Sequence, residues 1–443
     1  MFEHKKIFIL GMARSGYEAA KLLSKYDNKI LITDKKQQDL EKVKELEDLG
    51  VEIHICDDPT SLLDESYDWV IKNPGIRFDH PIVLKAEELG IKVTNEVEVA
   101  YNFLPKKVEI IGITGSNGKT TTTTLTYEML KSAGKRVHLG GNIGYPVCSL
   151  VDNCKEDDIL VLEISGHQLH DFINFKTNVS VMTNLTEVHT DHFGSYDNYK
   201  YNKCLIFKGH SESDIAILNL ENKDVMDGTK DIKSHKIMFS SAKEADVYIK
   251  DNSIYYFDSK VVDLKDIRLK GVHNYENIMC AISAVKQYGV SNEIIINLLK
   301  SFGGVEHRIE FVRELNKREF YNDSKATNVK STQIALSAFN SPTIVLLGGL
   351  DRGLPFDGLT DYLNNTKEIV CYGETKFKIK EYADGINKCC KVVDTLEEAI
   401  KLAYQDSEIG DVILLSPACA SWDQYENFEI RGNEFKKIVN ELE

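Results

Sequence analysis

A short glycine-bearing segment contains the residues whose types and spacing are best suited to chemistry. Positions 110–121 read Ile-Ile-Gly-Ile-Thr-Gly-Ser-Asn-Gly-Lys-Thr-Thr. An apolar run followed by a glycine turn predicts a buried strand, a tight loop and then a helix, here from Thr121 to Gly134. Because successive backbone N–H groups and a helix N-terminus attract anions, we expect this loop to bind phosphate.

Individual residues of the loop have distinct expected roles. Gly115 and Gly118 allow close approach of the backbone to a phosphate, Lys119 can meet the β- and γ-phosphates, and Thr120 can offer its hydroxyl to magnesium. The usual spacing places a glycine five residues before Gly118, where this chain has Ile113, so the loop is shorter than the standard pattern. A plain glycine-rich turn is the alternative, but the Gly-Lys-Thr-Thr ending favours a nucleoside triphosphate.

The composition is that of an ordinary folded chain too long for one hydrophobic core. With 443 residues, 42% hydrophobic and 28% charged, we expect two or three domains. The formal net charge of −15 argues against bulk binding to nucleic acid or to an anionic membrane. The sequence shows no signal core, no run of about 18 apolar residues and no Cys-x-x-Cys spacing. We therefore expect a cytosolic protein without membrane insertion and with free thiols, including Cys389 and Cys390.

The first part of the chain alternates strand-like and helix-like stretches. Strands are expected at 6–11, 29–34, 51–55, 69–72 and 91–94, with a helix at 16–25. This alternation predicts a parallel sheet with its ligand site at the carboxyl ends of the strands, where Asp34 and Asn73–Ile76 fall. A structural turn explains Asn73–Ile76 about as well as ligand contact does. Positions 11–16 resemble a dinucleotide fingerprint with Ala13 in place of its second glycine, so an NAD-dependent dehydrogenase is an alternative, although no hydride-transfer half follows.

Two polar groups of the central region are candidates to complete a phosphate site. The turn at Gly140–Gly144 can let Asn142 donate to a phosphate, although alone such a turn is more often a plain loop. The strand expected at Asp158–Ser165 carries Glu163 near its end, where nucleotide-binding sheets place a magnesium-binding acid. A carboxylate at the edge of the core, paired with a lysine, is the alternative for Glu163.

A second polar segment follows the next expected strand, which spans Val179–Asn184. It contains His189 and His192, which are only three positions apart, and no cysteine completes a zinc set. Magnesium with a phosphate-directed His189 therefore fits better than zinc. The helix expected at Tyr199–Lys208 carries Lys203. From its spacing alone, we expect Lys203 to be a solvated lysine on the surface.

Asn274 and Asn277 lie at the head of a helix expected from Ile278 to Tyr288. Amides on one helix face can recognise the edge of an adenine or cap the helix, and the residues alone favour capping. Their combination with the phosphate loop and Glu163 strengthens the nucleotide interpretation.

The last third again alternates strands and helices. His307 and Arg308 open it and could form an ion pair at a domain boundary. Three polar segments then follow expected strands. They are positions 322–328, the glycine turn that directs Arg352 outward, and the run from Val412 to Phe428. A generic strand and capped helix explain the shape of the last run but not its residues.

Together these motifs resemble those of the Mur ligases of bacterial cell-wall synthesis over essentially the whole chain. Thr114–Thr121 has the shortened phosphate loop of this family, and Ser416–Phe428 resembles the segment that holds D-glutamate in the branch that adds this amino acid. The resemblance implies an α/β fold in three domains. These are a Rossmann-like parallel-sheet domain for the UDP substrate at 1–97, a P-loop ATPase-like domain at 98–304 and a Rossmann-like domain for the amino acid at 305–443.

The resemblance also implies a role for each site residue. Expected ATP contacts are Gly115, Ser116, Asn117, Gly118, Lys119, Thr120, Thr121, Asn274, Asn277, Arg308 and Asp323. Expected contacts to the UDP substrate are Arg14, Ser15, Asp34, Lys35, Gly75, Asn142, Ser165 and His189. Expected magnesium ligands are Thr120, Glu163, His189 and, if carbamylated, Lys203. Expected D-glutamate contacts are Lys325, Thr327, Arg352, Ser421 and Phe428, and the expected catalytic set is Lys119, His189, Lys203 and Lys325.

The implied activity is ATP- and magnesium-dependent addition of D-glutamate to UDP-N-acetylmuramoyl-L-alanine through an acyl phosphate. The resemblance places it in peptidoglycan synthesis, and thereby in cell shape and division, and we expect a monomer. One alternative is a related ligase for another amino acid, which Ser416–Ser421 disfavours. A folate polyglutamate ligase would lack the N-terminal domain. A non-catalytic nucleotide-binding regulator would tolerate the loss of Lys119, Glu163 or His189, all of which are present.

Overall fold

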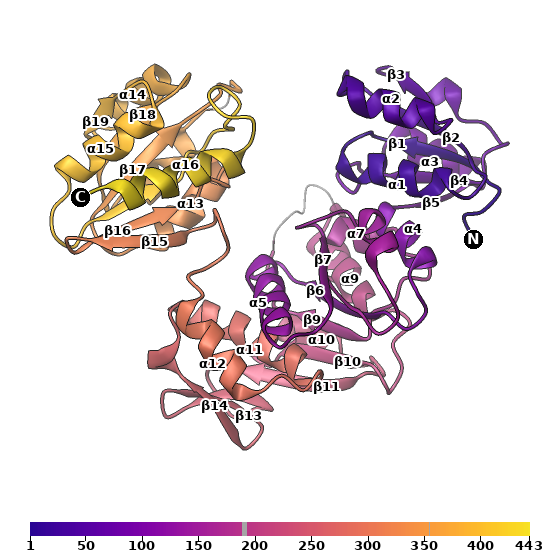
Figure 1. Cartoon of the computed structure of the whole chain (residues 1–443), viewed down its shortest axis with the longest axis horizontal. Coiled ribbons are helices and arrows are strands. Elements are labelled where there is room, and N and C mark those ends of the chain that lie inside the picture. Colours follow the sequence, from indigo (N-terminus) through magenta and orange to yellow (C-terminus); the bar gives the residue numbers. More distant parts are fainter. Residues whose placement is uncertain (188–192, 354) are drawn as a thin grey trace. The chain divides into compact units, whose positions relative to one another are not determined.

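The computed structural model describes residues 1–187, 193–353 and 355–443 and forms two compact units, Met1–Ser301 and Phe302–Glu443. The first unit contains two sheets and the second contains one, with helices alternating along the strands, so the predicted α/β class is confirmed (Figure 1). Every helix in these ranges is too short or too polar to span a lipid bilayer. The nine cysteines are all free thiols, as expected, and Cys389 is exposed.

The first sheet is fully parallel, as predicted for the N-terminal domain, in the order β3-β2-β1-β4-β5. Its central strands are continuous apolar runs because helices cover both faces of a parallel sheet. The strands are β1 (Lys6–Leu10), β2 (Lys29–Asp34), β3 (Glu52–Ile55), β4 (Trp69–Lys72) and β5 (Lys92–Thr94). The helices are α1 (Arg14–Ser24), α2 (Leu40–Asp48), α3 (Pro81–Glu88) and α4 (Glu96–Phe103).

The second sheet has the order β14-β13-β12-β11-β10-β9-β6-β8-β7. The strands from β7 to β12 are parallel, and β13 and β14 are added antiparallel at one edge. The strands are β6 (Glu109–Thr114), β7 (Val137–Gly141), β8 (Ile159–Glu163), β9 (Val179–Met182), β10 (Ile215–Asn219), β11 (His235–Ser240), β12 (Val247–Lys250), β13 (Ser253–Tyr256) and β14 (Ser259–Asp263). The helices are α5 (Lys119–Ser132), α6 (Val147–Leu150), α7 (Gly166–His170), α9 (Tyr196–Cys204), α10 (Lys223–Gly228), α11 (Val272–Lys286) and α12 (Asn292–Ser301).

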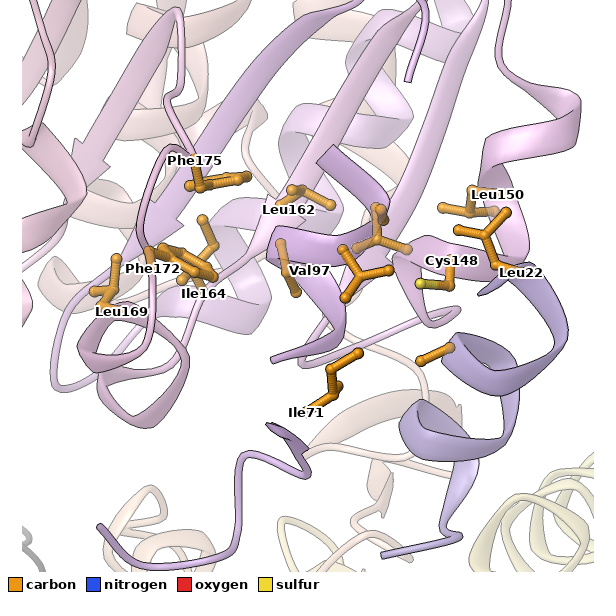
Figure 2. Packing of buried hydrophobic residues seen from close by; sticks show 14 of the residues in the cluster. Leu22, Ile71, Val97, Cys148, Leu150, Leu162, Ile164, Leu169, Phe172 and Phe175 are labelled. Atoms are coloured by element: carbon orange, nitrogen blue, oxygen red, sulfur yellow. The ribbon is translucent and has the colours of Figure 1, made fainter. Parts of the chain in front are cut away.

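One continuous core joins the two sheets of the first unit. Leu22 of α1 and Val97 of α4 are buried in the same cluster as Cys148 of α6 and Leu162 of β8, as Figure 2 shows. Close by, the side chain of Glu98 is fully buried and accepts hydrogen bonds from the backbone N–H groups at positions 173, 174 and 175. Apolar packing and a satisfied buried carboxylate therefore fix α4 against the central sheet.

The sheet of the second unit has the order β15-β16-β20-β17-β18-β19, with β15 antiparallel at one edge and the other strands parallel. The strands are β15 (Glu310–Leu315), β16 (Arg318–Asn322), β17 (Thr343–Gly348), β18 (Thr366–Tyr372), β19 (Cys390–Val392) and β20 (Val412–Leu415). The helices are α13 (Val329–Ser337), α14 (Lys376–Gly385), α15 (Leu396–Asp406) and α16 (Phe428–Glu441). The three predicted polar segments follow β16, β17 and β20, which are neighbours in the sheet.

A fully buried arginine on α16 ties two of these segments together. The Arg431 guanidinium donates to the hydroxyl and the carbonyl of Ser324, at 3.0 and 2.8 Å, and twice to the carbonyl of Cys419, at 3.2 Å. Because Ser324 follows β16 and Cys419 follows β20, one side chain fixes the loops at the ends of both strands.

We expect the substitution Arg431→Met to lower the free energy of unfolding by about 3 kcal/mol, because it leaves buried carbonyls without their charged donor. The measurement is urea denaturation followed by circular dichroism. Arg313→Met is the matched control, since Arg313 also donates to backbone carbonyls, those of Val439, Asn440 and Leu442, from a more exposed position. It should cost about 1 kcal/mol, and equal losses in the two variants would contradict the role given to burial.

Candidate active site

The predicted phosphate loop lies at the carboxyl end of β6, between β8 and β9. The helix α5 begins at Lys119 rather than at Thr121, and Gly118 precedes it in the left-handed region at φ +79°. The Lys119 amine folds back over the loop and donates to the carbonyls of Gly115 and Ser116, at 3.0 and 2.9 Å. The lysine is thus held above the N-terminus of α5, where the helix dipole attracts an anion.

The backbone amides at the start of the loop do not point where we expected. The N–H of Ser116 donates to the carbonyl of Asn184, at 2.8 Å, and the N–H of Asn117 donates to the Asn184 side chain, at 3.0 Å. Asn184 therefore braces the loop, and the positive field for a phosphate comes from the start of α5. Sequence reasoning placed Asn184 at a strand end but gave it no role. The sequence carried no signal for this role, because it depends on β9 lying beside β6.

The two asparagines lie inside a helix rather than before it. Because α11 begins at Val272, capping is wrong for both residues: the N-cap is Gly271, which has no side-chain cap. Asn274 donates to the carbonyl of Lys270, at 2.7 Å. Asn277 lies against the phosphate loop, since a Cβ at Gly118 would be 2.1 Å from its Oδ1. Asn277 is therefore brought to the loop, as an ATP contact requires.

Glu163 ends β8 next to the loop and is 2% exposed. One carboxylate oxygen accepts a hydrogen bond from the Asn142 amide, at 2.7 Å. The other, Oε2, is buried and makes no hydrogen bond within the described residues. A buried carboxylate oxygen without a partner is costly and fits a metal ligand. The arrangement brings Asn142 and Glu163 together, although we expected them to contact different groups.

Lys203 is not the surface residue that its spacing suggested, because its side chain is 2% exposed. Its amine donates to the Thr114 hydroxyl, at 3.1 Å, and lies 5.6 Å from the centre of the Tyr199 ring. Burial, and then repulsion from Lys119, hold the pKa of Lys203 well below its ordinary value, and attraction to Glu163 opposes this. Tyr199 is one helical turn earlier on α9, and this apolar neighbour was the missed sign of burial.

Four further predicted residues belong to this region, and the structure describes three of them. Thr120 is buried in the first turn of α5, with Thr121 half-buried beside it. Ser165 is the N-cap of α7 and accepts a hydrogen bond from the N–H of Gln168, at 3.3 Å, in a capping box. His189 lies outside the described residues, as do Asp191 and His192.

A cavity of about 620 Å³ lies at the carboxyl ends of the strands in the N-terminal sheet. Asp34, Lys35 and Gly75 line it, as a substrate site there requires. Arg14 and Ser15 are in the first turn of α1, outside this lining, and the Arg14 guanidinium donates to the carbonyl of Gly144, at 3.2 Å.

The fingerprint-like glycines of this domain have a packing explanation. A Cβ at Gly16 would lie 2.0 Å from the carbonyl oxygen of Gly11, and one at Gly11 would lie 2.4 Å from the amide of Asn73. These contacts require glycine at both positions whether or not a dinucleotide binds.

In the second unit, a cavity of about 170 Å³ gathers three predicted residues, Arg308, Asp323 and Lys325. Burial raises the pKa of Asp323 to about 7, against hydrogen bonds from the Ser416 hydroxyl and the N–H of Ile309. The neighbouring His307 shows no ion pair of its own within the described ranges. It is buried, its pKa is lowered by that burial, and its Nδ1 lies 3.0 Å from the Asn322 amide.

The predicted D-glutamate residues fall into two groups within this unit. The Lys325 amine lies 5.7 Å from the centre of the Phe428 ring, and Thr327 is half-buried two residues further on. The Arg352 guanidinium lies 5.0 Å from the centre of the exposed Trp422 ring, next to the buried Ser421. A backbone bridge between Leu350 and Ala420 fixes the second group.

Family models match three segments of the chain. These are the Mur ligase MurD-like N-terminal domain over residues 5–95, the Mur ligase middle domain over 113–285 and the Mur ligase glutamate ligase domain over 307–419. Together they span all three sheets.

Curated relatives and solved structures agree with these matches. UDP-N-acetylmuramoylalanine–D-glutamate ligases of Bacillus cereus (strain G9842) and Bacillus thuringiensis (strain Al Hakam) are 44% and 45% identical, over 100% of this chain and 98% of each relative. The structure of UDP-N-acetylmuramate-alanine ligase MurC from Thermotoga maritima is 19% identical with a TM-score of 0.58, covering 99% of both chains. MurF from Acinetobacter baumannii is 15% identical with a TM-score of 0.55, over 92% of this chain and 86% of that one. These structures support the shared fold, and the full-length relatives show that this chain belongs to the Mur ligase family.

Proposed function

We propose that this chain joins D-glutamate to UDP-N-acetylmuramoyl-L-alanine in an ATP-dependent reaction of peptidoglycan precursor synthesis. The observation that carries this proposal is the full-length match to ligases named for that reaction. The geometry supports it, because Lys119, Glu163 and the buried Lys203 gather beside a phosphate loop, and a separate set of cations lines the end of the C-terminal sheet. A non-catalytic regulator would have no need for a desolvated lysine at this place.

In the first step, the substrate carboxylate attacks the γ-phosphorus of ATP, ADP leaves, and an acyl phosphate forms. Lys119 and the N-terminus of α5 stabilise the charge on the transferring group. Asn277, packed against Gly118, holds the loop on the side of the nucleotide. We assign Arg308 and Asp323 to ATP as well.

Magnesium fits the buried, unpartnered Oε2 of Glu163. Thr120, Glu163, His189 and a carbamylated Lys203 are its proposed holders, and when bound it would neutralise charge on the phosphates. Lys203 suits carbamylation because only a neutral amine reacts with carbon dioxide, and its lowered pKa makes that form accessible. Asn142 keeps the Glu163 carboxylate oriented.

In the second step, the amine of D-glutamate attacks the acyl carbon, the C–N bond forms, the bond to phosphate breaks, and the amine gives up a proton. D-Glutamate brings two carboxylates, for which Lys325 and Arg352 supply cations. Ser421, Thr327 and Phe428 complete the proposed pocket. The UDP end of the other substrate is assigned to the 620 Å³ cavity, with Asp34, Lys35 and Gly75 in its lining.

The cellular context extends this proposal. The product would be a cell-wall precursor, so loss of the activity would affect cell shape and division. A cytoplasmic location, a monomeric state and the domain bounds 1–97, 98–304 and 305–443 stay predictions.

The reaction is tested by phosphate release from ATP and magnesium with UDP-N-acetylmuramoyl-L-alanine and one of several amino acids. We expect release only when D-glutamate is present, and none with L-glutamate, L-lysine, meso-diaminopimelate or no amino acid. Release with a different amino acid would keep the ATP chemistry but overturn the interpretation of Ser416–Phe428. No release with any of them would favour the regulator.

The substitution Lys203→Met should abolish product formation and flatten the pH dependence of unfolding. Because the pKa of Lys203 is depressed in the folded chain, the unfolded state binds more protons between that pKa and the ordinary value near 10.5, so wild-type stability rises with pH through this window. Urea denaturation at pH 7, 8.5 and 10, without carbon dioxide or bicarbonate so that Lys203 stays an amine, should show the wild type gaining stability relative to the variant.

The matched control is Lys200→Met, on the same helix. The Lys200 amine pairs with Asp197 and Asp224, and its pKa is raised. This variant should keep activity and show no such gain with pH.

The substitution Lys203→Ala tests the carbamate itself. Full activity of this variant without added bicarbonate would contradict the assignment of a carbamate to Lys203.

The substitution Trp422→Ala should raise KM for D-glutamate about fivefold and leave KM for ATP unchanged. The exposed indole holds Arg352 through a cation–π contact, which contributes on the order of 1 kcal/mol. Trp422→Phe keeps a ring and should raise KM less. If Trp422→Ala binds D-glutamate like the wild type, this ring does not position Arg352.

A further inference from the structure

A buried ion pair links the end of a strand in the N-terminal sheet to the end of a helix of the central domain. The amine of Lys72, the last residue of β4, lies 2.7 Å from Oδ2 of Asp171, which directly follows α7. Their side chains are 3% and 4% exposed. This is the environment in which a lysine and an aspartate must be paired to stay charged.

Each residue of the ion pair makes a second contact. The Lys72 amine also donates to the carbonyl of Ile76, at 3.0 Å, and Ile76 lines the 620 Å³ cavity. The other Asp171 oxygen lies 2.8 Å from Nδ1 of His170, and the His170 ring stacks on Phe78 at 5.6 Å. The Asp171 carboxylate is therefore connected to the cavity segment 73–78 by two routes.

The helix that precedes Asp171 leads to the residues proposed for phosphoryl transfer. Asp171 and His170 end a helix of only five residues that begins at Gly166, three positions after Glu163. A Cβ at Gly166 would lie 3.4 Å from Cε of Lys203. The backbone of the same helix end is fixed by Thr94, whose hydroxyl donates to the Asp171 carbonyl, at 2.9 Å. A short helix thus leads from the ion pair to Glu163 and Lys203, two of the four proposed residues of the metal site.

We propose that Lys72 and Asp171 are positioning residues that set the distance between the uridine-nucleotide cavity and the site of phosphoryl transfer. This inference rests on the proposed function, since only a substrate held at both ends needs that distance to be fixed. The uridine end would lie in the cavity and the carboxylate end beside Lys203 and Glu163. A small misplacement of a bound reactant strongly lowers a rate, whereas it need not change how either end binds alone.

Stability alone does not explain an ion pair at this place. Well-packed apolar residues of similar volume replace buried pairs at little or no cost, whereas removal of one partner strands a buried charge. The double variant Lys72→Met/Asp171→Leu therefore removes the link to Ile76 without leaving a charge behind. It separates a positioning role from a purely structural one.

The experiment compares the wild type with this double variant. We expect kcat/KM for UDP-N-acetylmuramoyl-L-alanine to fall about tenfold, while KM for ATP and Kd for UDP alone stay within about twofold. UDP alone would occupy only the cavity. Its Kd therefore measures binding at the uridine end and does not depend on where the carboxylate end of the full substrate is placed. An unchanged kcat/KM would overturn the proposal. A tenfold rise in Kd for UDP would overturn it too, because the pair would then only shape the cavity.

A second variant tests the other route and protects against misfolding of the first. Phe78 is half-buried, so Phe78→Ala should fold, and it removes the stack on His170. It should lower kcat/KM about threefold in the same pattern, with Kd for UDP unchanged, and no effect of Phe78→Ala would overturn the second route. The wild-type arm separates the two hypotheses, because absence of turnover there would refute the proposed function rather than the positioning role.

Discussion

The candidate active site depends on a lysine amine that the fold keeps away from water beside another lysine. Lys203 is buried against Tyr199, its amine is repelled by Lys119, and among the described residues Glu163 attracts it. A folded chain pays for such an arrangement with stability, since a desolvated cation near a like charge is unfavourable. A neutral amine removes that cost, and a neutral amine is also the form that can react with carbon dioxide, so the energetics of the fold are compatible with the proposed carbamylation.

Much of the fold could be predicted from the sequence because parallel strands leave a clear pattern. The buried runs at 29–34 and 69–72 became β2 and β4 with the expected bounds, and the order of polar segments after β16, β17 and β20 followed from alternation alone. The phosphate loop was found for a similar reason, since Gly118 and Lys119 combine backbone freedom with charge. These signals are local, so they can be seen without knowing which elements meet.

The parts that sequence reasoning missed depend on contacts between distant segments. Lys203 has the spacing of a surface residue, and only the approach of Thr114 and Gly166 encloses it. Asn184 engages the loop amides because β9 lies beside β6, which no local pattern states. Arg431 was likewise invisible, since a buried arginine has no periodic signature of its own. The start of α11 was misplaced because its first turn is polar, so apolar periodicity began only at Ile278.

A chain with net charge −15 must still receive substrates that are themselves anionic. Positively charged side chains gathered at single sites attract these substrates, whereas the net charge of the whole chain would repel them. In the first unit, Lys119 lies at the N-terminus of α5. In the second unit, Arg308 and Lys325 line one cavity. Lys119 follows β6 and Lys325 follows β16, where helix N-termini and loop amides add to the field of each cation. Because such short-range fields act within about 10 Å at moderate ionic strength, each anionic group is recognised only at its own subsite. Correct spacing between subsites therefore has to come from the rigid elements that join them, not from long-range attraction.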